Sequence, residues 1–144
     1  MIRSTYIGTN GYDQVYGVQF DKNGFPYIMG QTTGNWVPIN AIYVDAGAKQ
    51  FIGKLQPDLS SYIYTTTFGT ASTIPNISPI AFLVDRCENV YVSGWGGDVA
   101  GNNAFPNAGT FGMRVSTDAY KPTTDGKDFY FFVMKRDAAD PNPL

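Results

Sequence analysis

The stretch Val18-Gln-Phe-Asp-Lys-Asn-Gly-Phe-Pro-Tyr-Ile-Met-Gly30 decides the fold, because it returns as Phe82-Leu-Val-Asp-Arg-Cys-Glu-Asn-Val-Tyr-Val-Ser-Gly94. The two copies keep one constant spacing, which is how an internal repeat shows itself in a sequence. The matched positions are Asp21 with Asp85, Tyr27 with Tyr91, and Gly30 with Gly94. The 144-residue chain is therefore expected to contain two copies of one structural unit.

Two further echoes occur in the same order along the chain. Tyr6-Ile-Gly-Thr9 returns as Thr67-Phe-Gly-Thr70, and Phe51-Ile-Gly-Lys-Leu-Gln-Pro-Asp58 returns as Tyr130-Phe-Phe-Val-Met-Lys-Arg-Asp137. The connection before the last echo is longer in the second unit and is rich in Gly, Asn and Pro, so it is expected to be a loop. An insertion confined to one connection is typical of repeat architectures.

Each unit contains short, evenly spaced strand signals. Val15–Phe20 and Tyr27–Met29 flank Asp-Lys-Asn-Gly, whose Asn and Gly accept positive φ, which predicts a tight hairpin. A second hairpin is predicted from Phe51–Leu55 and Tyr62–Phe68. The composition agrees, because 10 Tyr, 10 Phe, 16 Gly and 9 Pro are a strand-and-turn inventory. The sequence predicts an all-β fold of about two four-stranded antiparallel units.

Such a unit has two apolar faces and open edges, so it must stack on neighbours as the blades of a β-propeller do. Residues 4–8 are expected to be the outer strand of a preceding blade, 12–70 a complete blade, and 77–137 a blade lacking its outer strand. Two blades do not close a ring, so we expect 1–144 to be part of a larger propeller or to be completed by other chains. The expected core positions are Val18, Phe20, Tyr27 and Met29, with their counterparts Phe82, Val84, Tyr91 and Ser93.

Charge and composition exclude several function classes. A net charge of −2 argues against a nucleic-acid partner, and no apolar run is long enough for a membrane span. With no His in the chain, Ser-His-Asp and Cys-His catalysis and His-ligated zinc are excluded. The one cysteine, Cys87, lacks an activating base, so we expect a small turn residue there.

The carboxylates of the chain offer two further kinds of site, an acid–base pair and a calcium site. Glu88, Asp98, Asp125 and Asp128 lie in or beside turns, where solvated carboxylates are the simpler interpretation. The Asp21-Lys22-Asn23-Gly24 stretch has oxygen-bearing side chains but no EF-hand pattern, which favours a hairpin turn. We therefore expect no enzyme activity, no cofactor and no metal site.

The repeats resemble the SBBP-type β-propeller repeat. The resemblance rests on Ser4-Thr-Tyr-Ile-Gly-Thr9, on Val18 to Thr32, and on Phe51-Ile-Gly-Lys-Leu-Gln-Pro-Asp58, and it covers most of residues 4–137. The second unit departs from it where Cys87-Glu88 replaces the usual glycine-containing turn. Repeats of this type are similar to those of large exported surface proteins of Bacteroidetes-type bacteria, so the resemblance implies a secreted or cell-surface bacterial protein.

Aromatic and amide side chains gather in the two long connections. In a propeller such connections emerge on one rim, and aromatic planes beside amides suit sugar stacking or protein contact. The alternative is that these aromatics anchor their own loops. The candidate ligand- or partner-binding residues are Trp36, Trp95, Asp98, Asn102, Phe105 and Tyr120.

The function expected from these observations is a non-catalytic propeller module that acts as a scaffold or as an adhesion or protein-interaction surface. Its partners would be further blades of the same chain or another protein. A carbohydrate-binding or carbohydrate-processing propeller, recognising a surface glycan, is the first alternative. The second is an assembly subunit whose sheet is completed by partner strands.

Overall fold

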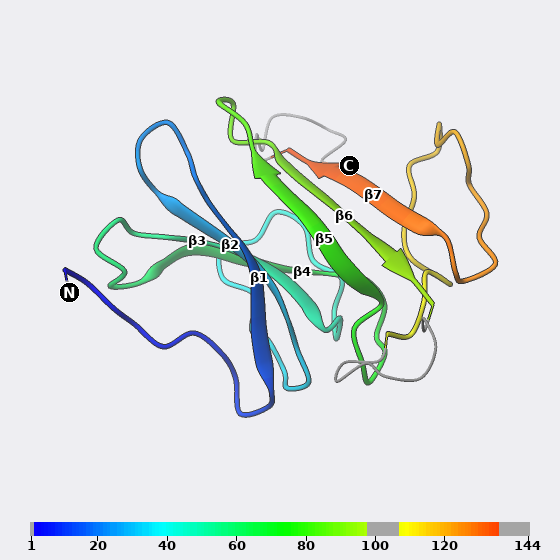
Figure 1. Ribbon diagram of the computed structural model, residues 1–144, viewed down its shortest axis with the longest axis horizontal. Coiled ribbons are helices and arrows are strands. Elements are labelled where there is room, and N and C mark those ends of the chain that lie inside the picture. Colours follow the sequence, from blue (N-terminus) through cyan, green and yellow to red (C-terminus); the bar gives the residue numbers. More distant parts are fainter. Residues whose placement is uncertain (1, 98–106, 136–144) are drawn as a thin grey trace.

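Seven strands in two antiparallel sheets make up the fold (Figure 1). The computed structural model describes residues 2–97 and 107–135, and no helix occurs in these two ranges. The first sheet has the order β1-β2-β3-β4 and the second has the order β5-β6-β7. The strands are β1 (Asp13–Phe20), β2 (Pro26–Thr32), β3 (Gln50–Leu55), β4 (Tyr62–Phe68), β5 (Ile77–Val84), β6 (Val90–Gly96) and β7 (Phe129–Met134). The predicted all-β fold and both predicted hairpins are confirmed.

The two sheets have equivalent strand pairing, as the sequence repeat predicts. Gly30 of β2 pairs with Phe51 of β3, and their counterparts Gly94 and Tyr130 pair in the same way between β6 and β7. The antiparallel registers therefore agree with the sequence alignment of the two units. The second sheet repeats the first three strands of the first sheet and has no fourth strand among the described residues.

A tight turn joins the first two strands of each sheet, and an aspartate organises it. Asp21 Oδ1 accepts the backbone N–H groups of Asn23 and Phe25 at 2.8 and 3.0 Å. Gly24 has a φ of 83°, a left-handed conformation that glycine adopts without strain. In the second turn Asp85 has the same role, but Glu88 occupies the left-handed position with a φ of 66°.

The main core lies between the sheets, where one face of each packs against the other and β1 contacts β5 (Figure 1). The rings of Phe68 and Phe132 meet across it, with centroids 4.9 Å apart. Gln50 is fully buried and adds a polar bridge: its Oε1 accepts the N–H groups of Asn76 and Ile77 at 3.0 and 3.1 Å. Both apolar contact and hydrogen bonds therefore fix the second sheet on the first.

Val18 and Phe20, predicted to be buried, are instead 55% and 63% exposed. Both lie on the face of the first sheet that points away from the second sheet, since Val18 pairs with Ile28 of the outer cluster. Their counterparts Phe82 and Val84 are half-buried and buried, because the first sheet covers them. The prediction that Val18 and Phe20 are buried is therefore wrong, because no sheet of the described structure covers this face.

Tyr27 and Met29 are buried as predicted, and so is Ser93, whereas Tyr91 is half-buried. Residues 4–8 belong to neither sheet. The expected partner of this segment is a blade that precedes the first sheet, so its assignment as an outer strand stays a prediction. In residues 2–97 and 107–135 no helix has the length and apolar character required to cross a bilayer.

Candidate interaction surfaces

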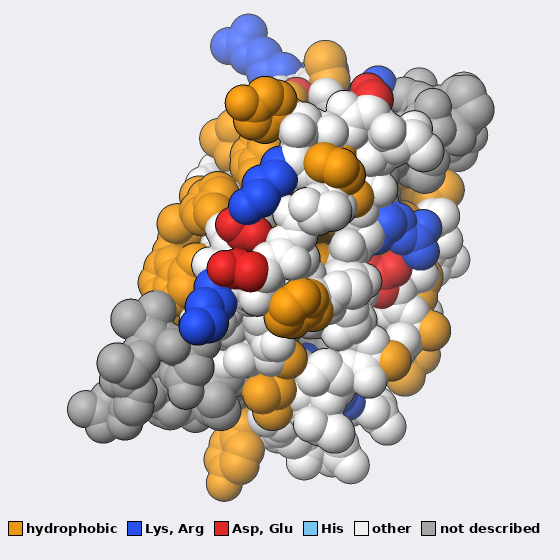
Figure 2. All heavy atoms as spheres, turned by 90° about the vertical axis from the view of Figure 1, so that its right-hand side faces the viewer, with side chains coloured by type: hydrophobic (Ala, Val, Ile, Leu, Met, Phe, Trp, Pro, Cys, Tyr) orange, Lys and Arg blue, Asp and Glu red, His pale blue; other side chains and the backbone are white. Residues whose placement is uncertain are grey.

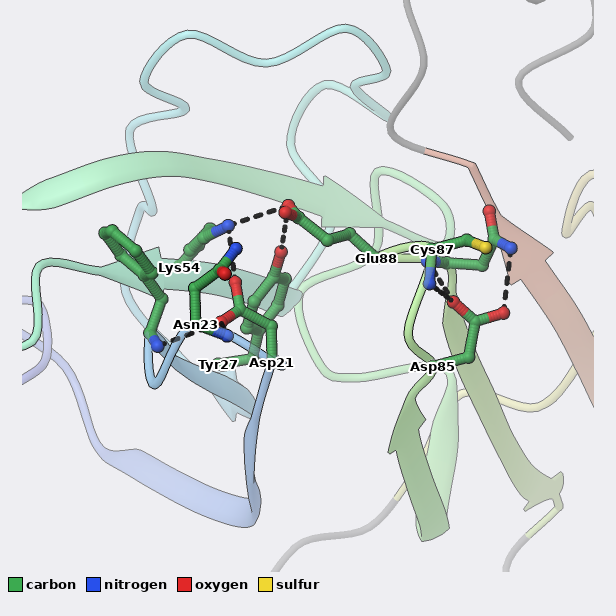
Figure 3. A network of polar contacts seen from close by, with 9 residues as sticks. Asp21, Asn23, Tyr27, Lys54, Asp85, Cys87 and Glu88 are labelled. Atoms are coloured by element: carbon green, nitrogen blue, oxygen red, sulfur yellow. Dashed lines mark hydrogen bonds and ion pairs between the residues drawn. The ribbon is translucent and has the colours of Figure 1, made fainter.

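A buried ion-pair network joins the two sheets at the end where their first turns lie (Figure 3). Lys54 Nζ, from β3, lies 2.8 Å from Asp21 Oδ2 and 2.7 Å from Glu88 Oε2. Asp21 belongs to the first turn, whereas Glu88 reaches over from the turn of the second sheet. Tyr27 donates its hydroxyl to the same Glu88 oxygen at 2.9 Å. We call these four residues the intersheet lock.

The intersheet lock is shielded from water. The Asp21 side chain is fully buried, the Lys54 side chain is 7% exposed, and the Glu88 side chain is 26% exposed. Burial alone would raise the pKa of Asp21, but hydrogen bonds from Lys54 and from two backbone N–H groups outweigh it and lower that pKa. The hydrogen bond from Lys54 is the main reason that the pKa of Glu88 is lowered.

The lock is a feature that residue patterns alone did not predict. Glu88 was interpreted as a solvated turn carboxylate, and the structure shows it paired with Lys54 and Tyr27 instead. Its signal in the sequence was the replacement of a turn glycine by the only Glu of the chain, at a position with positive φ. Asp128, which was also interpreted as solvated, accepts a hydrogen bond from the exposed Lys121 at 2.6 Å and keeps a side chain that is 29% exposed.

A second feature is a cleft beside Trp36, on the outer face of the first sheet. Trp36 stacks on Phe51 with a centroid distance of 3.6 Å and meets Tyr62 edge-on at 6.1 Å. The cleft holds about 380 Å³, and we call it the Trp36 cleft. Its lining combines aromatic, hydroxyl and amide groups: Thr9, Asn10, Asn35, Trp36, Tyr62 and Thr65.

The hydroxyl of Tyr62 is buried without a hydrogen-bond partner among the described residues. Burial raises the pKa of Tyr62 to about 12, and the charge of Asp13 adds to this shift. A buried polar atom that lacks a partner is costly in a folded protein. Tyr62 lines the Trp36 cleft, but its hydroxyl oxygen is itself buried, so a molecule bound in the cleft would reach this oxygen only after neighbouring side chains shift.

The other predicted site residues do not join Trp36. Val92 of β6 belongs to the core between the sheets, and successive residues of a strand point to opposite faces. Trp95, three residues further along β6, therefore lies on the face of the second sheet that points away from the first. Trp36 and Trp95 are thus on opposite outer faces of the sheet pair. Tyr120 is fully exposed in the loop beside β7. The remaining predicted residues, Asp98, Asn102 and Phe105, lie outside the described residues.

The outer face of the second sheet is apolar and open. Leu83, Phe129 and Phe131 are each more than half exposed on this face. Seen from the β7 side, hydrophobic side chains gather along one margin, while acidic and basic side chains lie next to each other in the middle (Figure 2). Exposed apolar area of this kind makes this face a candidate interaction surface.

Comparisons with known proteins bear on the first unit. No curated protein and no solved structure matched the chain. Residues 2–35 match the family model of the SBBP β-propeller repeat. The match covers the N-terminal segment, the β1–β2 hairpin and the start of the following loop. The chain therefore carries a β-propeller repeat within its all-β fold.

Proposed function

We propose that this chain is a non-catalytic module of a larger stacked β-propeller, and that it serves an exported cell-surface protein as a scaffold or as an adhesion or protein-interaction surface. The observation that carries the proposal is that the outer face of the first sheet has the same repeat positions as the face of the second sheet that the first sheet covers. Phe82 and Val84 pack against the first sheet, while their counterparts Val18 and Phe20 are exposed. A further sheet would cover them by the same contact that already joins the two sheets.

The carboxylates support a structural role. Asp21 and Glu88 share Lys54, Asp45 pairs with Arg114 at 3.1 Å, and Asp128 pairs with Lys121. The exported location and bacterial source in this proposal rest on the resemblance of the repeats to those of exported surface proteins.

A tandem chain, in which one polypeptide carries residues 1–144 twice, tests the scaffold proposal. The outer face of the first copy's second sheet would then meet the outer face of the second copy's first sheet. We expect a higher denaturation midpoint for the tandem chain than for the single chain, because repeat stability contains a term for each interface between neighbours. The control is a tandem chain with Phe131→Asp in its first copy. Equal midpoints for the single and tandem chains would refute the proposal.

Carbohydrate binding at the Trp36 cleft is the second candidate function. The specific observation in its favour is a cleft that offers an indole and two amides, beside a buried Tyr62 hydroxyl that has no hydrogen-bond partner among the described residues. Sugars present hydroxyl groups for hydrogen bonding and C–H faces for stacking on aromatic rings. The half-buried indole of Trp36 and the amides of Asn10 and Asn35 supply both kinds of contact.

A glycan array, followed by calorimetric titration of any hit, tests this candidate with the Tyr62→Phe variant. That variant removes one oxygen and leaves the ring in place, so we expect weaker glycan binding with no loss of folding stability. Tyr12→Phe is the control, since Tyr12 is exposed and does not line the cleft. Unchanged binding by Tyr62→Phe would exclude the Trp36 cleft as the glycan site.

A further inference from the structure

The second sheet has an open edge with a groove beside it. β7 pairs with β6 on one side, and on its other side no strand of the described residues pairs with it. A groove of about 600 Å³ runs along β7 and is closed on the far side by the loop that carries Arg114 and Tyr120. In the first sheet β4 occupies the corresponding place beside β3. The edge of β7 therefore has the position and the room for one more antiparallel strand.

The N-terminal segment, residues 3–9, has the same local structure as the end of β4, but it pairs with no strand of the two sheets. Gly8 and Gly69 both have positive φ, 155° and 122°. The threonine that follows each glycine, Thr9 or Thr70, donates a backbone hydrogen bond to a side-chain oxygen four or six residues further along the chain. Thr9 N–H donates to Asp13 Oδ2 at 2.8 Å, and Thr70 N–H donates to Asn76 Oδ1 at 2.7 Å. The same clasp thus precedes both β1 and β5.

The apolar contact of this segment is also repeated. Phe68, at the end of β4, packs on Phe132 of the second sheet. Its counterpart Ile7 packs on the outer cluster of the first sheet, which contains Ile28, Phe51 and Leu55. The N-terminal segment is therefore placed against the first sheet as β4 is placed against the second. Its remaining side stays open, and Tyr6 is fully exposed.

We propose that residues 3–7 of a second copy of this chain add to β7 as its missing antiparallel strand. The register follows from the β3–β4 pairs Phe51 with Thr67 and Ile52 with Thr66. Transferred by the repeat, these pairs become Tyr130 with Tyr6 and Phe131 with Thr5. This inference rests on the proposed stacking of sheets and adds to it the strand and the register by which the next copy attaches.

The strand that adds to β7 comes from a second copy, because residues 3–7 of the same molecule lie too far from its own β7. The N-terminus lies beyond the first sheet, at the opposite end of the molecule from β7 (Figure 1). When the segment of a second copy adds to β7, the first sheet of that copy comes over the outer face of the second sheet. Its exposed Val18 and Phe20 then meet the exposed Leu83 and Phe131. Such a contact is head-to-tail and generates a ring or a filament.

Disulfide trapping between two variants tests the register. One chain carries Thr5→Cys, the other carries Phe131→Cys, and both carry Cys87→Ser to remove the exposed native thiol. Under mild oxidation we expect a cross-linked heterodimer, since directly paired residues of antiparallel strands have the spacing that a disulfide needs. The control replaces Phe131→Cys by Leu83→Cys, an equally exposed position on the opposite edge of the same sheet, and we expect the heterodimer to be lost.

A Tyr6→Pro variant provides the second measurement. Proline disrupts strand pairing, so we expect self-association in sedimentation to be lost. The melting temperature of the monomer should stay unchanged, because the Tyr6 side chain is fully exposed and Tyr6 lies outside both sheets. Equal cross-linking at Phe131 and Leu83, or a cross-link within one doubly substituted chain, would overturn the inference. A stabilised tandem chain without the Thr5–Phe131 cross-link would leave the stacking proposal intact and refute the strand addition alone.

Discussion

Lys54 is enclosed by groups that come from both sheets, and this makes one side chain a large contributor to their union. Besides its two carboxylate partners, its ammonium lies 4.8 Å from the ring centroid of Phe25 and 4.9 Å from that of Tyr27. Removing one member of a buried ion pair is costly, because the remaining charge stays buried without compensation. The residue that carries the positive charge is therefore the most sensitive position of the lock.

The first prediction compares two lysines. Lys54→Met should lower the free energy of unfolding by about 3–5 kcal/mol, because the fully buried carboxylate of Asp21 loses its cation. Lys121→Met removes an exposed ion pair with Asp128 and should cost much less, because water already solvates both charges. Urea denaturation of both variants provides the measurement. Equal costs for the two variants would show that the lock contributes no more than a surface pair.

The second prediction separates the backbone of Glu88 from its carboxylate. Glu88→Ala and Glu88→Gly both remove the partner of Lys54, so their difference reports only the left-handed conformation at a φ of 66°. The glycine variant should be more stable by about 1 kcal/mol, since a Cβ is disfavoured there. If chemical denaturation gives both variants the same stability, the turn must relax to another conformation when the carboxylate is removed.

The third prediction concerns acid. The pKa values of Asp21 and Glu88 are lowered from their usual 3.8 and 4.5, so their ionised forms stabilise the folded state at pH values above these. This contribution is lost as the pH falls through the lowered pKa values of the folded state. In Lys54→Met the cation that lowers both pKa values is absent. The stability of that variant, followed by denaturation between pH 5 and pH 2, should decline less steeply than that of the unaltered chain.

At the scale of elements, the sequence predicted the parts that local chemistry determines. The Asp-x-x-Gly turn and the alternating strands were predicted from the residues, and the register between β6 and β7 followed from the repeat. The exposure of Val18 and Phe20 did not follow, because an alternating pattern indicates which residues share a face but not whether another sheet covers it. The loop that lies beside β7 has no repeated counterpart, so its position came only from the structure.

The fourth prediction uses this difference between faces. Phe20→Ala on β1 should change the free energy of unfolding by less than about 0.5 kcal/mol, because its ring is exposed in the single chain. Phe132→Ala on β7 makes the same chemical change in the intersheet core and should cost about 3–5 kcal/mol. Both values come from denaturant titration at low protein concentration. A large loss for Phe20→Ala would mean that its face is covered in solution.

At the scale of the whole molecule, the candidate sites followed from sequence only in part. Trp36 was predicted from its loop, and the structure adds the cleft and the Tyr62 hydroxyl, which no spacing of residues indicated. Trp95 was expected on the same rim, but strand alternation turns it to the opposite outer face. Which side chains converge depends on how the sheets stack, and a single sequence does not contain that information in its local patterns.

The fifth prediction concerns association. Two opposite outer faces carry exposed aromatic rings, so the sedimentation coefficient of the chain should rise with protein concentration. Phe131→Asp places a charge on one of these faces and should keep the chain monomeric, with an unchanged melting midpoint because this ring is 58% exposed. A compact monomer at every concentration of the unaltered chain would contradict the expectation that these faces seek partners.

The glutamate in the second turn has a consequence for how an array of similar sheets avoids misfolding. Near-identical repeats can dock on the wrong neighbour, which is a characteristic failure of repeat proteins. In the two units, Glu88 corresponds to Gly24 and Lys54 corresponds to Val133, so neither partner of the ion pair has a charged equivalent. The ion pair between Glu88 and Lys54 is thus specific to the contact between these two sheets. If the sheets packed in another order, Lys54 and Asp21 would lack Glu88. The ion pair between Lys54 and Glu88 therefore forms only when the two sheets pack in the observed order, and it favours that order over a swapped one.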